Sequence, residues 1–293
     1  MATRALVRHW CAMRLLITGA AGMLGLDLQA AAAAAGHELV ALARAELDIT
    51  DADAVESAIN AAAPDVVINC AAHTNVDGAE SDSDSAHRIN GTGAGSVARA
   101  ASRAGAWILQ VSTDYVFDGV KRTPYLESDP TAPRSVYGAS KLAGELAVAQ
   151  AAPDAHTIVR CSALFGNGGP CFPATMLRLA GEREELTVVD DQVTCPTFTA
   201  HLAPALLSLV TAASPPLGVL HVAPAGECSW YRFAVEIMDR TGAATRIVPG
   251  STAELARPAP RPGYSVMRSE RGAPVLPDWR DGLDGYLASR VAA

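Results

Sequence analysis

The sequence lacks the features of several protein classes. Its cysteines are few and form no C-x-x-C pair and no metal-ligand spacing with histidine, which argues against a zinc site. We expect buried thiols in a reducing cytoplasm, with disulfides in a secreted protein as the alternative. The six positions are Cys11, Cys70, Cys161, Cys171, Cys195 and Cys228.

Long apolar runs and basic blocks are also missing. No run reaches the roughly 18 unbroken apolar residues that a membrane helix needs. The net charge is −8, and nucleic-acid binding needs clustered Lys and Arg, so we expect neither nucleic acid nor membrane as a partner. Residues 1–12 carry no apolar segment of signal-peptide length. We expect them to be an extension, with Met13 as an alternative start.

Strand and helix patterns alternate in the first half. Gly and Pro bound the short apolar runs that predict buried parallel strands, at 14–18, 37–43, 65–72 and 106–113. Helical patterns lie between them, at 23–35, 51–64 and 84–104. This alternation predicts an α/β fold with a doubly wound parallel sheet (Rossmann), which binds ligands beyond the carboxyl ends of its strands.

The rhythm changes after about residue 160. Pro and Gly gather at 166–173, 214–218 and 257–263, and the expected strands 186–190 and 218–223 are short. We therefore expect residues 13–160 to form an NADP-binding Rossmann domain, joined by segments from about 190–225. Residues 161–293 would then form mainly a smaller substrate-binding lobe.

A glycine turn follows the first expected strand. In TGAAGMLG (18–25), Gly19 suits the tight turn, Gly22 lets a pyrophosphate approach the backbone, and Gly25 lets the helix pack close to the sheet. The helix N-terminus offers N–H groups and partial positive charge to phosphates. Dinucleotide binding is predicted, with an ordinary structural turn as the alternative.

The end of the second strand bears on cofactor choice. NAD sites usually place a carboxylate there for the ribose 2′-hydroxyl, but this chain has Arg44 and no acid before Glu46. Arg44 can pair with a 2′-phosphate, which favours NADPH. If Arg44 merely faces solvent, NADH is accepted as well. Asp48 and Ile49 are expected to flank the adenine.

Tyr137 and Lys141 are four residues apart, so they share one face of a helix. An ammonium beside a phenol, with the positive nicotinamide ring of an oxidised cofactor, favours the phenolate and makes Tyr137 a proton donor or acceptor. Thr113 closes the fourth strand and is expected to polarise the substrate oxygen, with Ser112 as the alternative. A nucleotide-binding fold with an idle site is the competing interpretation.

With these motifs the chain resembles the dTDP-4-dehydrorhamnose reductase family of extended short-chain dehydrogenases/reductases, over about residues 14–280. The segments that carry the resemblance are TGAAGMLG (18–25), LDITD (47–51), PDVVINCAAHTNVDGAE (64–80), VSTDYVFDG (111–119), VYGASKLAGE (136–145), VVDDQVTCPT (188–197) and RPAPRPGYSVM (257–267).

The resemblance implies a reaction: NAD(P)H delivers hydride to C4 of dTDP-4-dehydro-β-L-rhamnose, and Tyr137 protonates the oxygen. It also implies which residues bind. The cofactor residues would be Gly19, Gly22, Met23, Leu24, Gly25, Arg44, Asp48, Ile49, Ala71, Ala72, His73, Thr74, Tyr137 and Lys141. The substrate residues would be Thr74, Val76, Asp77, Thr113, Asp114, Tyr115 and Ala163.

Two positions bear on the sugar. Related dehydratases carry a Glu where this chain has Tyr115, and a tyrosine is a poor carboxylate substitute, so simple reduction is expected. The family usually has a tryptophan that meets the sugar where this chain has Ala163. A sister deoxysugar reductase or epimerase is therefore an alternative, unless Trp230 or Phe172 refills the space. A non-catalytic NADP-binding regulatory subunit is a third hypothesis.

Remaining features stay open. No metal is predicted, although Glu182, Glu184 and Glu185 could hold Mg²⁺ at a subunit contact instead of forming a solvated helix end. His73 is expected to pack or hydrogen-bond. The arginines of the 257–261 segment either reach the diphosphate of a nucleotide sugar or belong to a rigid surface loop. A homodimer and a cytoplasmic location complete the expectations.

Overall fold

The computed structural model describes residues 12–291; most of the expected extension, with Cys11, lies outside this range. Six strands form one entirely parallel sheet, in the order β10-β5-β4-β3-β1-β2. Their bounds are β1 Arg14–Thr18, β2 Glu38–Leu42, β3 Val66–Asn69, β4 Trp107–Thr113, β5 His156–Cys161 and β10 Gly218–His221. The doubly wound parallel sheet is confirmed.

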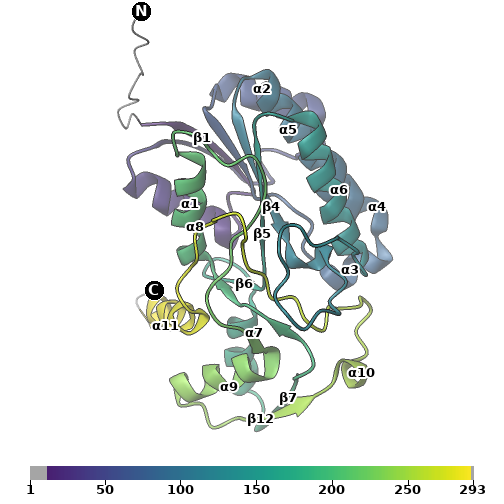
Figure 1. Cartoon of the computed structure of the whole chain (residues 1–293). Helices are drawn as coiled ribbons and strands as arrows, with labels where there is room; N and C mark the ends of the chain where they lie inside the picture. Colours follow the sequence, from purple (N-terminus) through teal and green to yellow (C-terminus); the bar gives the residue numbers. More distant parts are fainter. Residues whose placement is uncertain (1–11, 292–293) are drawn as a thin grey trace, which may run out of the picture.

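Helices cover both faces of this sheet (Figure 1). One face carries α2 (Ala52–Ala62), α5 (Ala94–Arg103) and α6 (Val136–Ala151), and the other carries α1 (Met23–Ala34) and α8 (Thr199–Val210). The Asp51 carboxylate caps α2 by accepting hydrogen bonds from the N–H groups of Asp53 and Ala54, as the sequence predicts.

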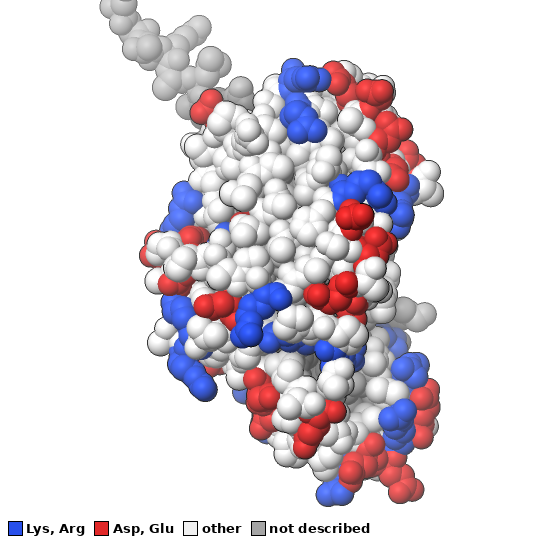
Figure 2. All heavy atoms as spheres, turned by 90° about the vertical axis from the view of Figure 1, so that its right-hand side faces the viewer, with Lys and Arg blue, Asp and Glu red and all other residues white. Residues whose placement is uncertain are grey.

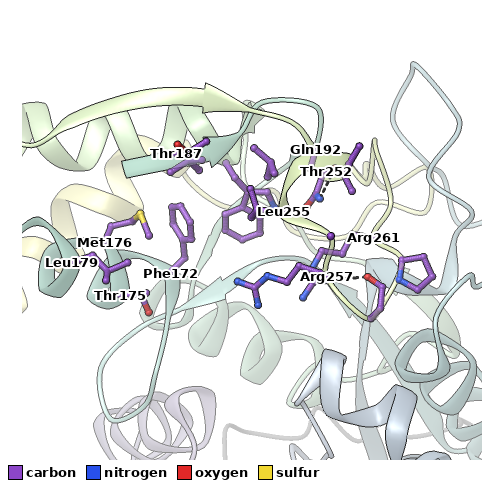
Figure 3. A pocket seen from close by; sticks show the side chains of 17 residues that line it. Phe172, Thr175, Met176, Leu179, Thr187, Gln192, Thr252, Leu255, Arg257 and Arg261 are labelled. Atoms are coloured by element: carbon purple, nitrogen blue, oxygen red, sulfur yellow. Dashed lines mark hydrogen bonds between the residues drawn. The ribbon is translucent and has the colours of Figure 1, made fainter. Parts of the chain in front are cut away.

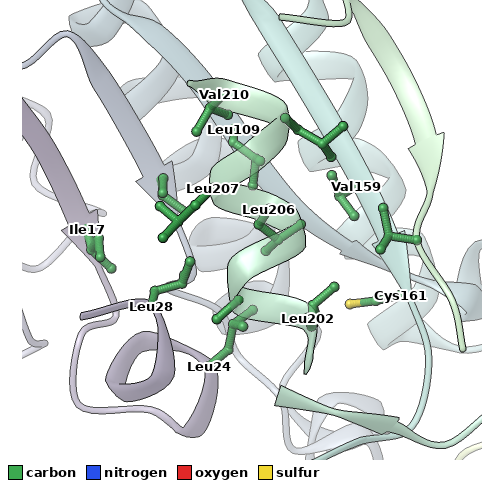
Figure 4. Packing of buried hydrophobic residues seen from close by; sticks show 14 of the residues in the cluster. Ile17, Leu24, Leu28, Leu109, Val159, Cys161, Leu202, Leu206, Leu207 and Val210 are labelled. Carbon is green, nitrogen blue, oxygen red and sulfur yellow. The ribbon is translucent and has the colours of Figure 1, made fainter. Parts of the chain in front are cut away.

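Helix α8 comes from late in the chain, yet it packs on the early strands. Leu202, Leu206 and Val210 follow a four-residue spacing, are buried, and meet Leu24 and Leu28 of α1 (Figure 4). Each such leucine stabilises the fold by about 1.5–3 kcal/mol. Because β10 also joins the main sheet, we propose that residues 13–160 form one nucleotide-binding unit with α8 and β10, which are the parts of the 190–225 segment that reach it.

The stretch 84–104 departs from the expected single helix. It consists of α4 (Ser83–His87), a π-helical turn (Arg88–Gly93) and α5. The wider turn brings the Asn90 backbone against α6, where a Cβ on Gly144 would lie 2.1 Å from the Asn90 carbonyl oxygen. A short helix not expected from the sequence, α3 (Val76–Ser81), precedes this region.

The rest of the chain builds a smaller lobe around aromatic side chains. Phe165, Phe198, Phe233, Trp279 and Tyr286 are all buried in one cluster. Three small sheets surround it: β7 (Glu185–Val189) with β12 (Arg246–Gly250), β8 (Val193–Thr194) with β11 (Cys228–Ser229), and β6 (Leu164–Phe165) with β9 (Thr197–Phe198). Its helices are α7 (Phe172–Ala180), α9 (Trp230–Thr241), α10 (Thr252–Leu255) and α11 (Trp279–Val291).

The surface and the cysteines fit the composition. On the face shown in Figure 2, which is the right-hand side of Figure 1, acidic and basic side chains are interspersed around a broad uncharged area.

The five cysteines in the described range are free thiols, and all except the half-buried Cys70 are buried. Within residues 12–291, no helix combines the length and apolarity that crossing a membrane requires.

Candidate active site

A cavity of about 780 Å³ opens at the carboxyl edge of the main sheet. Its walls come from the glycine turn, the ends of β3, β4 and β5, the start of α6, and the smaller lobe. Fourteen of the expected site residues line it: Gly19, Gly22, Met23, Leu24, Gly25, Ala72, Thr74, Val76, Thr113, Asp114, Tyr115, Tyr137, Lys141 and Ala163. The cavity lining does not include the other six, which are Arg44, Asp48, Ile49, Ala71, His73 and Asp77.

The backbone of the glycine turn is packed so closely that two of its glycines could not carry a side chain. Gly19 has φ +66°, and a Cβ there would lie 2.6 Å from the Ala71 nitrogen. A Cβ on Gly25 would lie 2.5 Å from the Gly19 oxygen. Gly22 has no such conflict and precedes α1 without a side chain to cap it, so the first N–H groups of α1 remain available to phosphate oxygens. These residues fit a dinucleotide pyrophosphate.

Helix α6 places the phenol and the amine beside the end of β4. Ser135 caps the helix by accepting a hydrogen bond from the Gly138 N–H at 3.1 Å. Tyr137, in the first turn, lines the cavity together with Thr113. One turn further, Lys141 is buried and donates to the Val111 carbonyl at 2.6 Å. Thr113, Tyr137 and Lys141 therefore meet at one wall of the cavity.

The electrostatics differ from the sequence-based expectation. Burial raises the pKa of the Tyr137 phenol, and the neighbouring Asp114 raises it further, against the effect of the hydrogen bond with Thr113. The expectation that the amine and an oxidised nicotinamide together favour the phenolate finds no support in the protein without cofactor, and with the cofactor bound it stays a prediction. Burial also lowers the pKa of Lys141, because its ammonium has lost water.

Asp114 is a buried carboxyl at the same wall. Burial raises its pKa to about 6, although hydrogen bonds from Ser265 and Thr113 act in the opposite direction. The Thr113 hydroxyl donates to it at 3.0 Å. Tyr115 stands edge-on to Tyr137, with ring centroids 5.5 Å apart, and burial raises its pKa too. Among residues 12–291, Asp114 is therefore the one carboxyl of this wall, and Tyr115 contributes a phenol in place of a second acid.

Two supporting groups were not predicted in these roles. Asn90, in the π-helical turn, accepts a hydrogen bond from the His73 N–H at 2.8 Å and donates to the His73 carbonyl and the Ser140 hydroxyl. It thereby ties the 71–74 stretch to α6. Glu145, one turn beyond Lys141, accepts from Ser112 and forms a buried bidentate ion pair with Arg160. The i, i+4, i+8 spacing on α6 was its only sequence signal.

The residues expected to select the cofactor lie outside the cavity. Arg44 is exposed, and Asp48 accepts hydrogen bonds from the Thr50 N–H and hydroxyl. These bonds lower the pKa of Asp48, and the positive charges of Arg44 and Arg88 contribute. Ile49 is buried and packs near Gly93. The pairing of Arg44 with a 2′-phosphate stays a prediction. Arg88, the second positive charge near Asp48, was not predicted from the sequence.

A second cavity of about 490 Å³ adjoins the first. Phe172, Gln192 and Arg261 are among the residues that line it (Figure 3). Gln192 and Trp230 line both cavities, and the Trp230 ring lies 4.6 Å from the Phe172 ring, centroid to centroid. Trp230 therefore supplies an indole at the edge of the large cavity. Ala163 lines that cavity with a backbone φ of +45°, in the left-handed region.

The two arginines of the 257–261 segment line the second cavity and are held by one carboxylate. Asp77 pairs with Arg257 and Arg261, each at 3.0 Å, and accepts the Ala259 N–H at 3.2 Å. The hydrogen bonds from Arg261 and then Arg257 hold the pKa of Asp77 down at about 2. Asp77, expected to approach the sugar, instead links α3 to the smaller lobe.

The acidic residues near the end of α7 form ion pairs. Glu182 pairs with Arg178, and Glu185 pairs with Arg246. In the described part of the chain, no three His, Cys, Asp or Glu side chains come together as a metal site would require.

A doubly wound sheet, a glycine turn and a Tyr-x-x-x-Lys helix beside a strand-end threonine define an extended short-chain dehydrogenase/reductase. The family model described as "RmlD substrate binding domain" matches residues 13–291. The chain belongs to this family.

Three relatives illustrate the similarity. A dTDP-4-dehydrorhamnose reductase from Streptomyces griseus is 45% identical, covering 92% of this chain and 91% of the relative. The spore coat polysaccharide biosynthesis protein SpsK from Bacillus subtilis is 42% identical over 96% of this chain and 99% of its own length. A crystal structure of dTDP-4-dehydrorhamnose reductase from Bacillus anthracis in complex with NADP has a TM-score of 0.91 at 37% identity, over 95% of this chain and 100% of that one.

Proposed function

We propose that this chain is an NADPH-dependent reductase that converts dTDP-4-dehydro-β-L-rhamnose to dTDP-L-rhamnose. The observation that carries the proposal is the meeting of Thr113, Tyr137 and Lys141 at a cavity that begins in the glycine turn. The names of the relatives supply the substrate, and the complex of the Bacillus anthracis enzyme with NADP supports the cofactor.

The glycine turn would hold the pyrophosphate of NADPH, whose chemistry when bound is hydride donation to a carbonyl carbon. Thr113 is placed to hydrogen-bond the carbonyl oxygen. Tyr137 gives its phenolic proton to that oxygen as the C–H bond forms, and the C=O bond becomes C–OH. Lys141, one turn away on α6, stabilises the phenolate left behind.

The second cavity offers room for the nucleotide end of the substrate. It continues from the large cavity past Gln192 and Trp230, and it presents the guanidinium groups of Arg257 and Arg261. Guanidinium groups are suited to diphosphate oxygens. We propose that the sugar lies in the large cavity and that the nucleoside diphosphate reaches into the second.

A sister 4-ketoreductase acting on another deoxysugar is the second candidate. The small side chain of Ala163 at the cavity wall favours it, because it leaves room for a differently substituted ring. A panel of dTDP-4-keto-6-deoxyhexoses with NADPH separates the two candidates by their kcat/KM values. The regulatory-subunit hypothesis requires that no member of the panel is turned over.

The mechanism is tested by Tyr137→Phe, with Tyr231→Phe on α9 as the control because Tyr231 lines neither cavity. Loss of a positioned proton donor should lower kcat by about 10²–10⁴-fold. NADPH binding, followed by cofactor fluorescence, should be retained. Undiminished turnover by Tyr137→Phe would remove this tyrosine from the mechanism.

A further inference from the structure

The buried hydroxyl of Thr194 has no hydrogen-bond partner within residues 12–291, and this calls for an explanation. It closes β8, is 4% exposed, and lines the large cavity. Among residues 12–291 its Oγ1 finds no hydrogen-bond partner. Nearby buried threonines of the same lobe are bonded: Thr197 donates to the Cys195 carbonyl and Thr199 to the Phe165 carbonyl. A buried hydroxyl left unpaired is destabilising, so such a group calls for a functional explanation.

Backbone contacts place Thr194 beside the reacting end of the cavity. Strand β8 pairs with β11 on one side, with Thr194 opposite Cys228. On the other side, the Ser265 N–H donates to the carbonyl of Val193 at 2.8 Å. Ser265 in turn lines the large cavity together with Asp114, which follows the catalytic Thr113. Thr194 therefore belongs to the wall that faces the keto sugar in the proposed function.

Other polar groups of this wall already have partners. The Thr113 hydroxyl donates to the Asp114 carboxyl at 3.0 Å and accepts the Tyr115 N–H at 3.2 Å, and the Ser112 hydroxyl donates to Glu145. Trp230 and Ala163 contribute apolar surface. Thr194 is thus the group at which an additional ligand hydroxyl would gain a hydrogen bond, and a threonine hydroxyl can both donate and accept.

We propose that Thr194 is a specificity-determining residue: its hydroxyl, which is buried in this structure, turns toward the cavity and bonds a ring hydroxyl of the 4-keto sugar. The inference rests on the proposed function and deepens it. Thr194 does not line the second cavity, which separates it from the nucleotide end of the substrate. A site that hydrogen-bonds a substrate hydroxyl discriminates against analogues that lack this group.

The test compares Thr194→Val, which keeps the shape and removes the hydroxyl, with Thr194→Ser, which keeps the hydroxyl. Each is assayed with the parent dTDP-4-keto-6-deoxyhexose and with its 2-deoxy and 3-deoxy analogues. Thr194→Val should lower kcat/KM for the parent by roughly 5- to 100-fold and leave it unchanged for one deoxy analogue. Thr194→Ser should retain the preference for the parent.

Thermal unfolding supplies a readout that a structural role would not share. Because the hydroxyl is unpaired in the protein, Thr194→Val should keep or raise the unfolding midpoint. The matched control is Thr245→Val, since Thr245 is buried, lines neither cavity, and donates to the Ala180 and Arg183 carbonyls. This control should lower the midpoint and leave the substrate preference unchanged.

Two outcomes count against the proposals, and they are distinct. If Thr194→Val lowers kcat/KM equally for the parent and both deoxy analogues, or lowers the midpoint as Thr245→Val does, the inference about Thr194 is overturned and the reductase assignment stands. If the wild-type chain binds NADPH but reduces no keto sugar in the panel, the proposed function fails and the inference fails with it.

Discussion

The buried ion pair between Glu145 and Arg160 gives the sharpest stability prediction. Both residues are 4% exposed, and the two hydrogen bonds that join them are 2.9 and 2.7 Å long. Arg160 also lies over the Phe117 ring at 5.1 Å, and Ser112 donates to the same carboxylate at 2.5 Å. Glu145→Met would leave the guanidinium buried without its counter-charge.

The magnitude follows from the geometry. Removing one partner of a buried pair costs about 3–5 kcal/mol, because the remaining charge is neither hydrated nor paired. For a chain of this size about 1 kcal/mol corresponds to roughly 2 °C, so Glu145→Met and Arg160→Met should each lower the unfolding midpoint by about 6–10 °C. The double variant leaves no charge. Its main unpaired group is the Ser112 hydroxyl, at about 1–3 kcal/mol, since the contact of Arg160 with His221 Nε2 is long at 3.4 Å; its midpoint should therefore fall by about 2–6 °C.

Differential scanning fluorimetry of the wild type, the two single variants and the double variant measures this double-mutant cycle. Adding Ser112→Ala to the double variant should recover most of the remaining loss in the unfolding midpoint, because it removes the hydroxyl that had donated to Glu145. Losses that simply add in the double variant would show that the two side chains act independently. Single-variant changes below about 2 °C would show that the pair contributes little, and either result refutes the reasoning.

Three further predictions concern the cavity. Gly25→Ala should raise the NADPH dissociation constant roughly 10-fold or more in a fluorescence titration, because its Cβ would lie 2.5 Å from the Gly19 oxygen. Asp77→Asn should raise KM for the nucleotide sugar roughly 5- to 30-fold at nearly constant kcat in steady-state assays, because it loosens the arginines of the second cavity. Asp114 binds its proton more tightly when folded, since its pKa rises from 3.8 to about 6. Stability should therefore fall by about 3 kcal/mol as pH rises through that interval and stay lower above it, and Asp114→Asn should lack this loss when midpoints are measured against pH.

Local sequence patterns were sufficient for the frame of the site. Gly19 and Gly25 must be glycine because a Cβ at either would strike the neighbouring backbone. This requirement is visible in the spacing of the glycines in the sequence. Thr113 closes a strand, and Tyr137 and Lys141 are one helical turn apart, so short-range periodicity brings each to the carboxyl edge of the sheet. The parallel order of the strands does the rest.

Partners distant in the sequence could not be predicted in this way. Asp77 and Arg261 are 184 positions apart, and no local pattern in either segment indicates that the two side chains pair. The unpaired state of the Thr194 hydroxyl depends on every group packed around it. The π-helical turn at Asn90 likewise depends on the close approach of α6, while its local sequence suits an ordinary helix. Each of these is a property of tertiary packing.

The raised pKa of Tyr137 is consistent with reduction. When hydride reaches a carbonyl carbon, the oxygen becomes strongly basic and needs a donor that is still protonated at neutral pH. Burial keeps the phenol in that form, so Tyr137 is ready to donate before the reaction begins. Lys141 and the Thr113 hydroxyl then matter most after the transfer, because they stabilise the phenolate in a site that water stabilises poorly. A phenol that was already ionised could not protonate the sugar, so the amine is better understood as stabilising the product of proton transfer than as acidifying the donor in advance.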